Sequence, residues 1–119
     1  MRIILVVDGD LGFVVYLSLA LTRAGYMAVP STSIDGAKPL LRDLGYSKID
    51  LLIVNFSLPG AMGLLKEFKR DSLRVIQIDD SRVARIQQVP VDGAIRKAPG
   101  ADAVTRWLRT VRRVLGKAA

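Results

Sequence analysis

The sequence predicts an α/β fold in which helices cover both faces of a parallel sheet. Strand-length runs such as Ile3 to Val7 and Leu51 to Val54 are apolar at every position, which is typical of strands buried on both faces. These runs alternate with helical segments in five units of roughly 20 to 25 residues. Several runs end abruptly in a polar residue. Because the carboxyl ends of parallel strands meet at one edge, we expect functional side chains there.

The first unit is a strand over Ile3 to Val7 that runs into Asp8-Gly9-Asp10. A helix is expected from Leu11 to Ala24, with Asp10 as its N-cap and Gly25 as its C-terminal stop. Its apolar positions fall on one helical stripe. They are Val14, Leu17, Leu21 and Ala24.

The second unit begins with a short strand from Tyr26 to Val29, closed by Pro30. Residues 31–33 offer N-caps for a helix that ends at Gly45. Its apolar residues are Ala37, Leu40, Leu41 and Leu44. Because proline is tolerated only in the first turn, Pro39 predicts a helix that either begins near Gly36 or is kinked.

The third strand spans Asp50 to Asn55, and the helix that follows, from about Ala61 to Lys69, buries Leu64, Leu65 and Phe68. A fourth strand from Val75 to Ile78 ends in Asp79-Asp80. These two units continue the alternation of strand and helix.

The last part of the chain holds a segment from Ser81 to Gln88 in which only Val83 and Ile86 are apolar, and Pro90 ends it. A short or irregular fourth helix is therefore expected. A brief strand from Gly93 to Arg96 precedes Lys97. The final helix is predicted from Ala101 to Leu115, with a buried stripe of Val104, Leu108, Val111 and Leu115.

Composition excludes several classes of function. The chain has 119 residues, enough for one domain with its own core. It has no Cys and no His, which excludes disulfides, the usual zinc sites and imidazole catalysis. The apolar run Leu11 to Leu21 is too short to span a bilayer, and acids precede it where a secretory signal has basic residues. We expect a cytoplasmic protein that needs no cofactor and no membrane.

Four polar residues follow the predicted strands and are expected at one edge of the sheet. They are Asp8, Asn55, Asp79 and Lys97. Asn55 is the first candidate, although a neutral amide is neither a nucleophile nor a good ligand for a hard cation. The alternative is an asparagine that ends its strand by bonding nearby backbone.

Three motifs give the chain a family resemblance. VVDGD at Val6 to Asp10, VNFSLPGAMG at Val54 to Gly63 and RKAP at Arg96 to Pro99 resemble the receiver domain of two-component response regulators, over essentially the whole chain. The resemblance implies a single receiver-like domain over residues 1–119. It also implies a flavodoxin-like five-stranded parallel sheet of order 2-1-3-4-5, flanked by five helices.

In that family an acidic pair after the first strand and an aspartate after the third strand hold magnesium. The aspartate after the third strand also accepts a phosphoryl group. A hydroxyl and a lysine contact the phosphoryl. The resemblance places Asp8, Gly9, Asn55, Asp79 and Lys97 at these positions. Only Asp8 and Lys97 keep the family's chemistry. The resemblance therefore implies a degenerate pocket with no metal.

The substitutions have physical consequences. Phosphoryl transfer needs an anionic acceptor and a divalent cation, whereas Asn55 is neutral and Gly9 has no side chain. A charge on Asp79 repels an anionic phosphoryl about 4 Å away by roughly 4 kcal/mol at an effective dielectric near 20. We favour a role for Lys97 as the counter-ion of Asp8 and Asp79 over a role in binding a ligand.

The final helix is rich in arginine, and the chain carries a net charge of +7. The family docks partners on the face formed by its fourth helix, fifth strand and fifth helix. The corresponding residues are Ala94, which replaces the switch aromatic, and Arg106, Trp107, Arg109 and Arg113. One interpretation is a contact surface for a protein partner or a homodimer. The other is a solvated helix with Trp107 packed against the fourth helix.

The sequence therefore predicts a phosphorylation-independent signalling module that acts by protein contact or dimerisation in bacterial signal transduction or transcription control. The alternative is binding of nucleic acid or an acidic ligand by the arginine-rich helix, although no DNA-recognition motif is present. The acids at Asp8 and Asp10 argue against a phosphate-binding loop or a Rossmann site, because they stand where a phosphate would bind. With no His, a hydrolase has only Ser57 or Ser81 with Lys97, so no enzymatic activity is predicted.

Overall fold

A computed structural model describes residues 1–43, 48–68, 73–80, 91–97 and 100–116. Its sheet has five parallel strands in the order β2-β1-β3-β4-β5, which confirms the predicted fold class and topology. The strands are β1 (Ile3–Val7), β2 (Met27–Ser31), β3 (Leu51–Val54), β4 (Arg74–Asp79) and β5 (Gly93–Arg96). The helices of the described ranges are α1 (Leu11–Arg23), α2 (Ile34–Asp43), α3 (Ala61–Phe68) and α4 (Ala103–Leu115).

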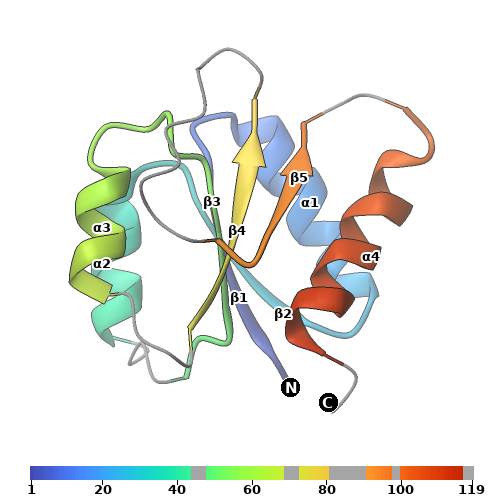
Figure 1. The fold of residues 1–119 in the computed structure, drawn as a ribbon, viewed down its shortest axis with the longest axis horizontal. Coiled ribbons are helices and arrows are strands. Elements are labelled where there is room, and N and C mark those ends of the chain that lie inside the picture. Colours follow the sequence, from blue (N-terminus) through green and yellow to red (C-terminus); the bar gives the residue numbers. More distant parts are fainter. Residues whose placement is uncertain (44–47, 69–72, 81–90, 98–99, 117–119) are drawn as a thin grey trace.

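Helices lie on both faces of the sheet (Figure 1), with α1 and α4 on one side and α2 and α3 on the other. Successive residues of each strand point to opposite faces, so each buried strand serves two cores. In β1, Ile4 and Val6 pack toward α1 and α4, while Leu5 and Val7 pack toward α2 and α3. This double burial explains why the central strands are apolar at every position.

Two prolines lie inside elements that they were expected to limit. Pro30 is within β2, at the edge of the sheet, where a strand needs hydrogen bonds on one side only. Pro39 is inside α2, which begins at Ile34, so the predicted start near Gly36 is wrong. Pro39 and Asp35 are both exposed, so water can bond the Asp35 carbonyl that lacks its helical donor.

The buried stripe of α4 differs from the predicted one. The buried residues are Ala103, Trp107, Val111 and Val114, whereas Val104, Leu108 and Leu115 are half-buried at the margin of the same core. Turning the helix this way buries the large indole of Trp107, which gains more apolar burial than a valine or leucine would. The side chain of Val114 comes so close to β5 that a Cβ on Gly93 would lie 3.0 Å from its Cγ2 atom.

The short fourth helix predicted at 81–88 lies outside the described residues. Within the part of the chain that is described, no helix is both long and apolar enough to cross a membrane.

Candidate functional site

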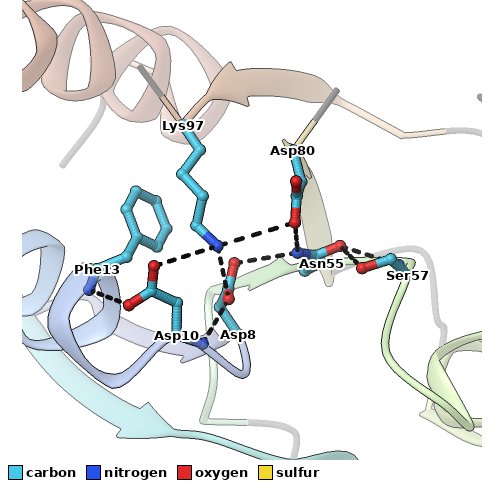
Figure 2. A network of polar contacts seen from close by, with 7 residues as sticks. All are labelled: Asp8, Asp10, Phe13, Asn55, Ser57, Asp80 and Lys97. Carbon is cyan, nitrogen blue, oxygen red and sulfur yellow. Dashed lines mark hydrogen bonds and ion pairs between the residues drawn. The ribbon is translucent and has the colours of Figure 1, made fainter. Parts of the chain in front are cut away.

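The carboxyl ends of β1, β3 and β5 bring Asp8, Asn55 and Lys97 together (Figure 2). Backbone hydrogen bonds extend past the strand ends and hold these residues in register. The Asn55 N–H donates to the Val7 carbonyl at 3.0 Å, and the Lys97 N–H donates to the Asp79 carbonyl at 3.1 Å. The convergence predicted for these three side chains is therefore present.

An ion pair between Lys97 and Asp8 lies at the centre of the site. The Lys97 Nζ atom is 2.9 Å from Asp8 Oδ1, 3.8 Å from Asp10 Oδ2 and 4.0 Å from Asp80 Oδ2. It also lies 5.0 Å from the centroid of the Phe13 ring, within cation–π range. Asp8 is only 2% exposed, so the ammonium compensates a carboxylate that water barely reaches.

The acid that β4 contributes is Asp80 and not the predicted Asp79. The Asp80 carboxylate accepts a hydrogen bond from Asn55 Nδ2 at 3.4 Å and reaches Lys97. Asp79 is the last residue of β4 and pairs in register with Arg96 of β5. Asp80 is the first residue after the strand, and it lines the pocket around Lys97.

The amide of Asn55 has partners on both of its atoms. Its Nδ2 donates to Asp8 Oδ2 at 3.2 Å and to Asp80, while its Oδ1 accepts from Ser57 N at 2.9 Å and Ser57 Oγ at 2.7 Å. The nitrogen faces the carboxylates because only an N–H can donate to them. Asn55 is thus both a strand end that bonds nearby backbone and a link between two acids.

Gly9 lies beside this network but adds no group to it. A Cβ on Gly9 would meet the Leu58 Cδ2 atom at 3.3 Å, so a larger residue there requires Leu58 to shift. The pocket has a volume of ≈ 320 Å³. Its lining residues are Asp8, Gly9, Asp10, Asn55, Ser57, Leu58, Asp80 and Lys97.

These residues do not fit the magnesium ion that receiver domains hold at the corresponding positions. Asp8 directs one oxygen at the Lys97 ammonium and the other at the Asn55 amide, so neither is directed at a metal ion. Asn55 presents N–H groups, which repel a cation, toward the shared space. Among the described residues, no group of three or more Asp, Glu, His or Cys side chains is placed to hold a metal.

Three members of the network were not assigned to it from the sequence. Asp10 was predicted only as the N-cap of α1, a role that its 3.2 Å bond from Phe13 N confirms, and it also faces Lys97. The sequence suggests Ser57 only as a candidate nucleophile, whereas in the structure its hydroxyl donates a hydrogen bond to Asn55 Oδ1. The Asn-x-Ser spacing is typical of an Asx turn and would have predicted this contact. For Asp80, the sequence pattern points instead to its neighbour Asp79.

The predicted interaction face is only partly on the surface. Ala94, Arg106, Arg109 and Arg113 are exposed, but Trp107 is 3% exposed and belongs to the core. Its Nε1 donates to the Arg96 carbonyl at 2.9 Å. Its ring makes edge contacts with Phe13 and Tyr16, at centroid distances of 5.3 Å and 5.9 Å. Trp107 is therefore a core residue and not part of the contact surface.

Comparison with known proteins gives matches at the level of structure. No protein-family model and no curated protein matches the chain. A response regulator receiver protein from Burkholderia phymatum matches with a TM-score of 0.82 and 23% identity, over 100% of this chain and 98% of that one. The receiver domain of the hybrid histidine kinase CckA matches with a TM-score of 0.77 and 19% identity, over 96% and 99% of the two chains.

A third match is a chain from the crystal structure of the P1 domain of CheA3 in complex with CheY6 from R. sphaeroides, with a TM-score of 0.78, 17% identity and 96% coverage of both chains. At these identities the likeness shows the fold, which is the flavodoxin-like fold of receiver domains. It extends over nearly the whole chain.

Proposed function

We propose that this chain is a phosphorylation-independent, receiver-like signalling module that acts through protein contacts in bacterial signal transduction or transcription control, and that it is not an enzyme. The observation that carries the proposal is the bonding of Asn55. Its amide takes the acceptor position of the fold and is bound on both sides by Asp8, Asp80 and Ser57.

The chemistry of the pocket supports this function. A phosphoryl acceptor must be an anionic oxygen, and the transferring group must be neutralised by cations. Here the acceptor position is a neutral amide, and the Lys97 ammonium already neutralises Asp8 at 2.9 Å. Three carboxylates, from Asp8, Asp10 and Asp80, would face an incoming phosphoryl group. Their repulsion opposes its binding.

We expect acetyl phosphate with magnesium to leave the mass of the protein unchanged. Beryllofluoride should likewise cause no shift of the amide resonances of Asp8, Asn55 and Lys97, because position 55 carries an amide and not the carboxylate that would hold it. A phosphorylatable response regulator in the same reaction is the positive control. The Asn55→Asp variant tests whether the missing carboxylate at position 55 is by itself enough to prevent phosphorylation. A stoichiometric phosphoryl adduct on the parent protein would disprove the proposal.

The proposed contact surface is the exposed flank of α4 next to β5, defined by Ala94, Arg106, Arg109 and Arg113. Because the pocket is not phosphorylated in this proposal, phosphorylation does not control the α4 surface. Its contacts are therefore constitutive. Exposed arginines are favoured at interfaces because each guanidinium offers several donors.

We expect the double variant Arg106→Glu, Arg109→Glu to weaken partner binding or self-association roughly tenfold or more. Light scattering measures the association, with and without magnesium and phosphodonor, and neither addition should change it. The matched control is Lys66→Glu, an exposed charge reversal on α3, on the other side of the sheet. A strictly monomeric protein whose variant binds its partner normally would contradict this assignment.

A second candidate function is supported by the charge of α4. Arg106, Arg109, Arg112 and Arg113 are all exposed, and the helix contains no acid. Such a surface binds nucleic acid without sequence preference and with strong salt dependence. A mobility shift that is present at low salt and retained at physiological salt would favour this function over protein contact.

A further inference from the structure

The outer face of α1 is apolar. Leu11 is 64% exposed and Leu19 is 50% exposed, and Val15 and Tyr16 are also exposed. Leu11, Val15 and Leu19 are spaced four residues apart and so lie along one side of the helix. A helix on a protein surface normally carries charged residues on its outer face, but the only charged residue of α1 is Arg23. An exposed apolar strip of this length indicates an interaction surface.

The strip continues into a groove between α1 and α4 with a volume of ≈ 480 Å³. From α1 the groove is lined by Tyr16, Leu19 and Ala20, and from α4 by Val104 and Leu108. Val104 and Leu108 are half-buried at the margin of the core, because α4 buries the stripe that contains Trp107 instead of the predicted one. An arginine from each helix also lines the groove, Arg23 from α1 and Arg112 from α4, together with Ala24 at the end of α1.

The charges of the groove indicate what occupies it. Neither α1 nor α4 contains an acidic residue, and both arginines are exposed. A second copy of this chain placed groove to groove would bring arginines together with no carboxylate from either helix to neutralise them. A partner with carboxylates beside an apolar ridge would pair with Arg23 and Arg112 and also cover the leucines.

We propose that the α1–α4 groove binds an amphipathic helix of a different protein, with the helix's apolar stripe on Leu19 and Leu108 and its acidic edge facing Arg23 and Arg112. A groove between two packed helices suits the side-chain ridge of a third helix. The inference goes beyond the proposed function, since this surface is separate from the α4 flank of Arg106, Arg109 and Arg113. It requires nothing of the pocket around Lys97.

The test is a displayed library of helices as long as α1, with a fixed leucine stripe and flanking positions that vary among Glu, Gln and Lys. Selection on the parent protein should enrich Glu at positions flanking the stripe. The best binder is then synthesised with Glu flanks and with Lys flanks. The Glu peptide should bind at least roughly tenfold more tightly than the Lys peptide, and this ratio should fall toward one at about 1 M salt.

Two variants locate the binding. Leu19→Glu should lower the affinity for the Glu peptide roughly tenfold or more, because it places a charge in the apolar groove. Arg23→Glu with Arg112→Glu should reverse the preference toward the Lys peptide. Lys66→Glu on α3 and Arg109→Glu on the other flank of α4 should leave both affinities within about twofold, which separates this site from the proposed α4 surface.

Three results would overturn the proposal. The first is selection without enrichment of Glu, and the second is binding that Leu19→Glu leaves unchanged. The third is sedimentation that shows self-association of the parent protein abolished by Leu19→Glu, since the groove would then be covered by a second copy. Circular dichroism of each variant confirms that its fold is retained.

Discussion

Trp107→Ala is expected to lower the free energy of unfolding by about 4 kcal/mol, the range for a large aromatic side chain removed from a core. Trp107 is 3% exposed and packs edge-on against Phe13 and Tyr16, so alanine leaves a cavity that these rings do not fill. The variant also leaves the Arg96 carbonyl without its indole donor. Urea unfolding followed by circular dichroism measures the loss.

Two variants separate the parts of this effect. Trp107→Phe keeps a ring in the core but removes the indole N–H, and should cost much less than alanine, with about 1 kcal/mol of it from the lost hydrogen bond. Arg106→Ala, on the exposed face of the same helix, should change stability by no more than about 0.5 kcal/mol. If Trp107→Ala were as stable as Arg106→Ala, Trp107 would not be part of the core.

Lys97→Ala should destabilise the fold by about 3 kcal/mol. The loss arises because Asp8, which is 2% exposed, would keep its charge without the ammonium 2.9 Å away. The value is at the lower end for a broken buried pair, since Asp8 still accepts hydrogen bonds from Asp10 N and Asn55 Nδ2. Urea melts of the parent and variant provide the measurement.

The matched control removes both charges together. Lys97→Met with Asp8→Asn keeps side chains of similar size and an acceptor oxygen at position 8, and should recover at least half of the loss. Lys66→Ala, an exposed lysine on α3, should have almost no effect. Equal stability of Lys97→Ala and the parent protein would show that the acidic cluster is solvated and needs no counter-ion.

The sequence by itself determined the sheet and most of the site. Strands buried on both faces must be apolar at every position, so the runs at Ile3–Val7 and Leu51–Val54 specified a doubly covered parallel sheet. In such a sheet the residues that follow the strands necessarily meet at one edge. The contact of Asp8, Asn55 and Lys97 follows from this. The cap at Asp10 and the stop at Gly25, whose φ is +98°, follow separately from the local preferences of helix ends.

The tertiary structure decided three features that local patterns leave open. Which of two adjacent acids enters the pocket depends on where β4 ends and turns, and Asp80 rather than Asp79 reaches Asn55. Helical periodicity allowed α4 to bury either of two overlapping stripes, and packing against α1 and β5 selected the one with Trp107. The inward stripe of α1 leaves Leu11, Val15 and Leu19 on its other side, and only the packing of the described elements shows that these apolar side chains remain exposed. All three depend on contacts between segments far apart in the chain, which no window of sequence contains.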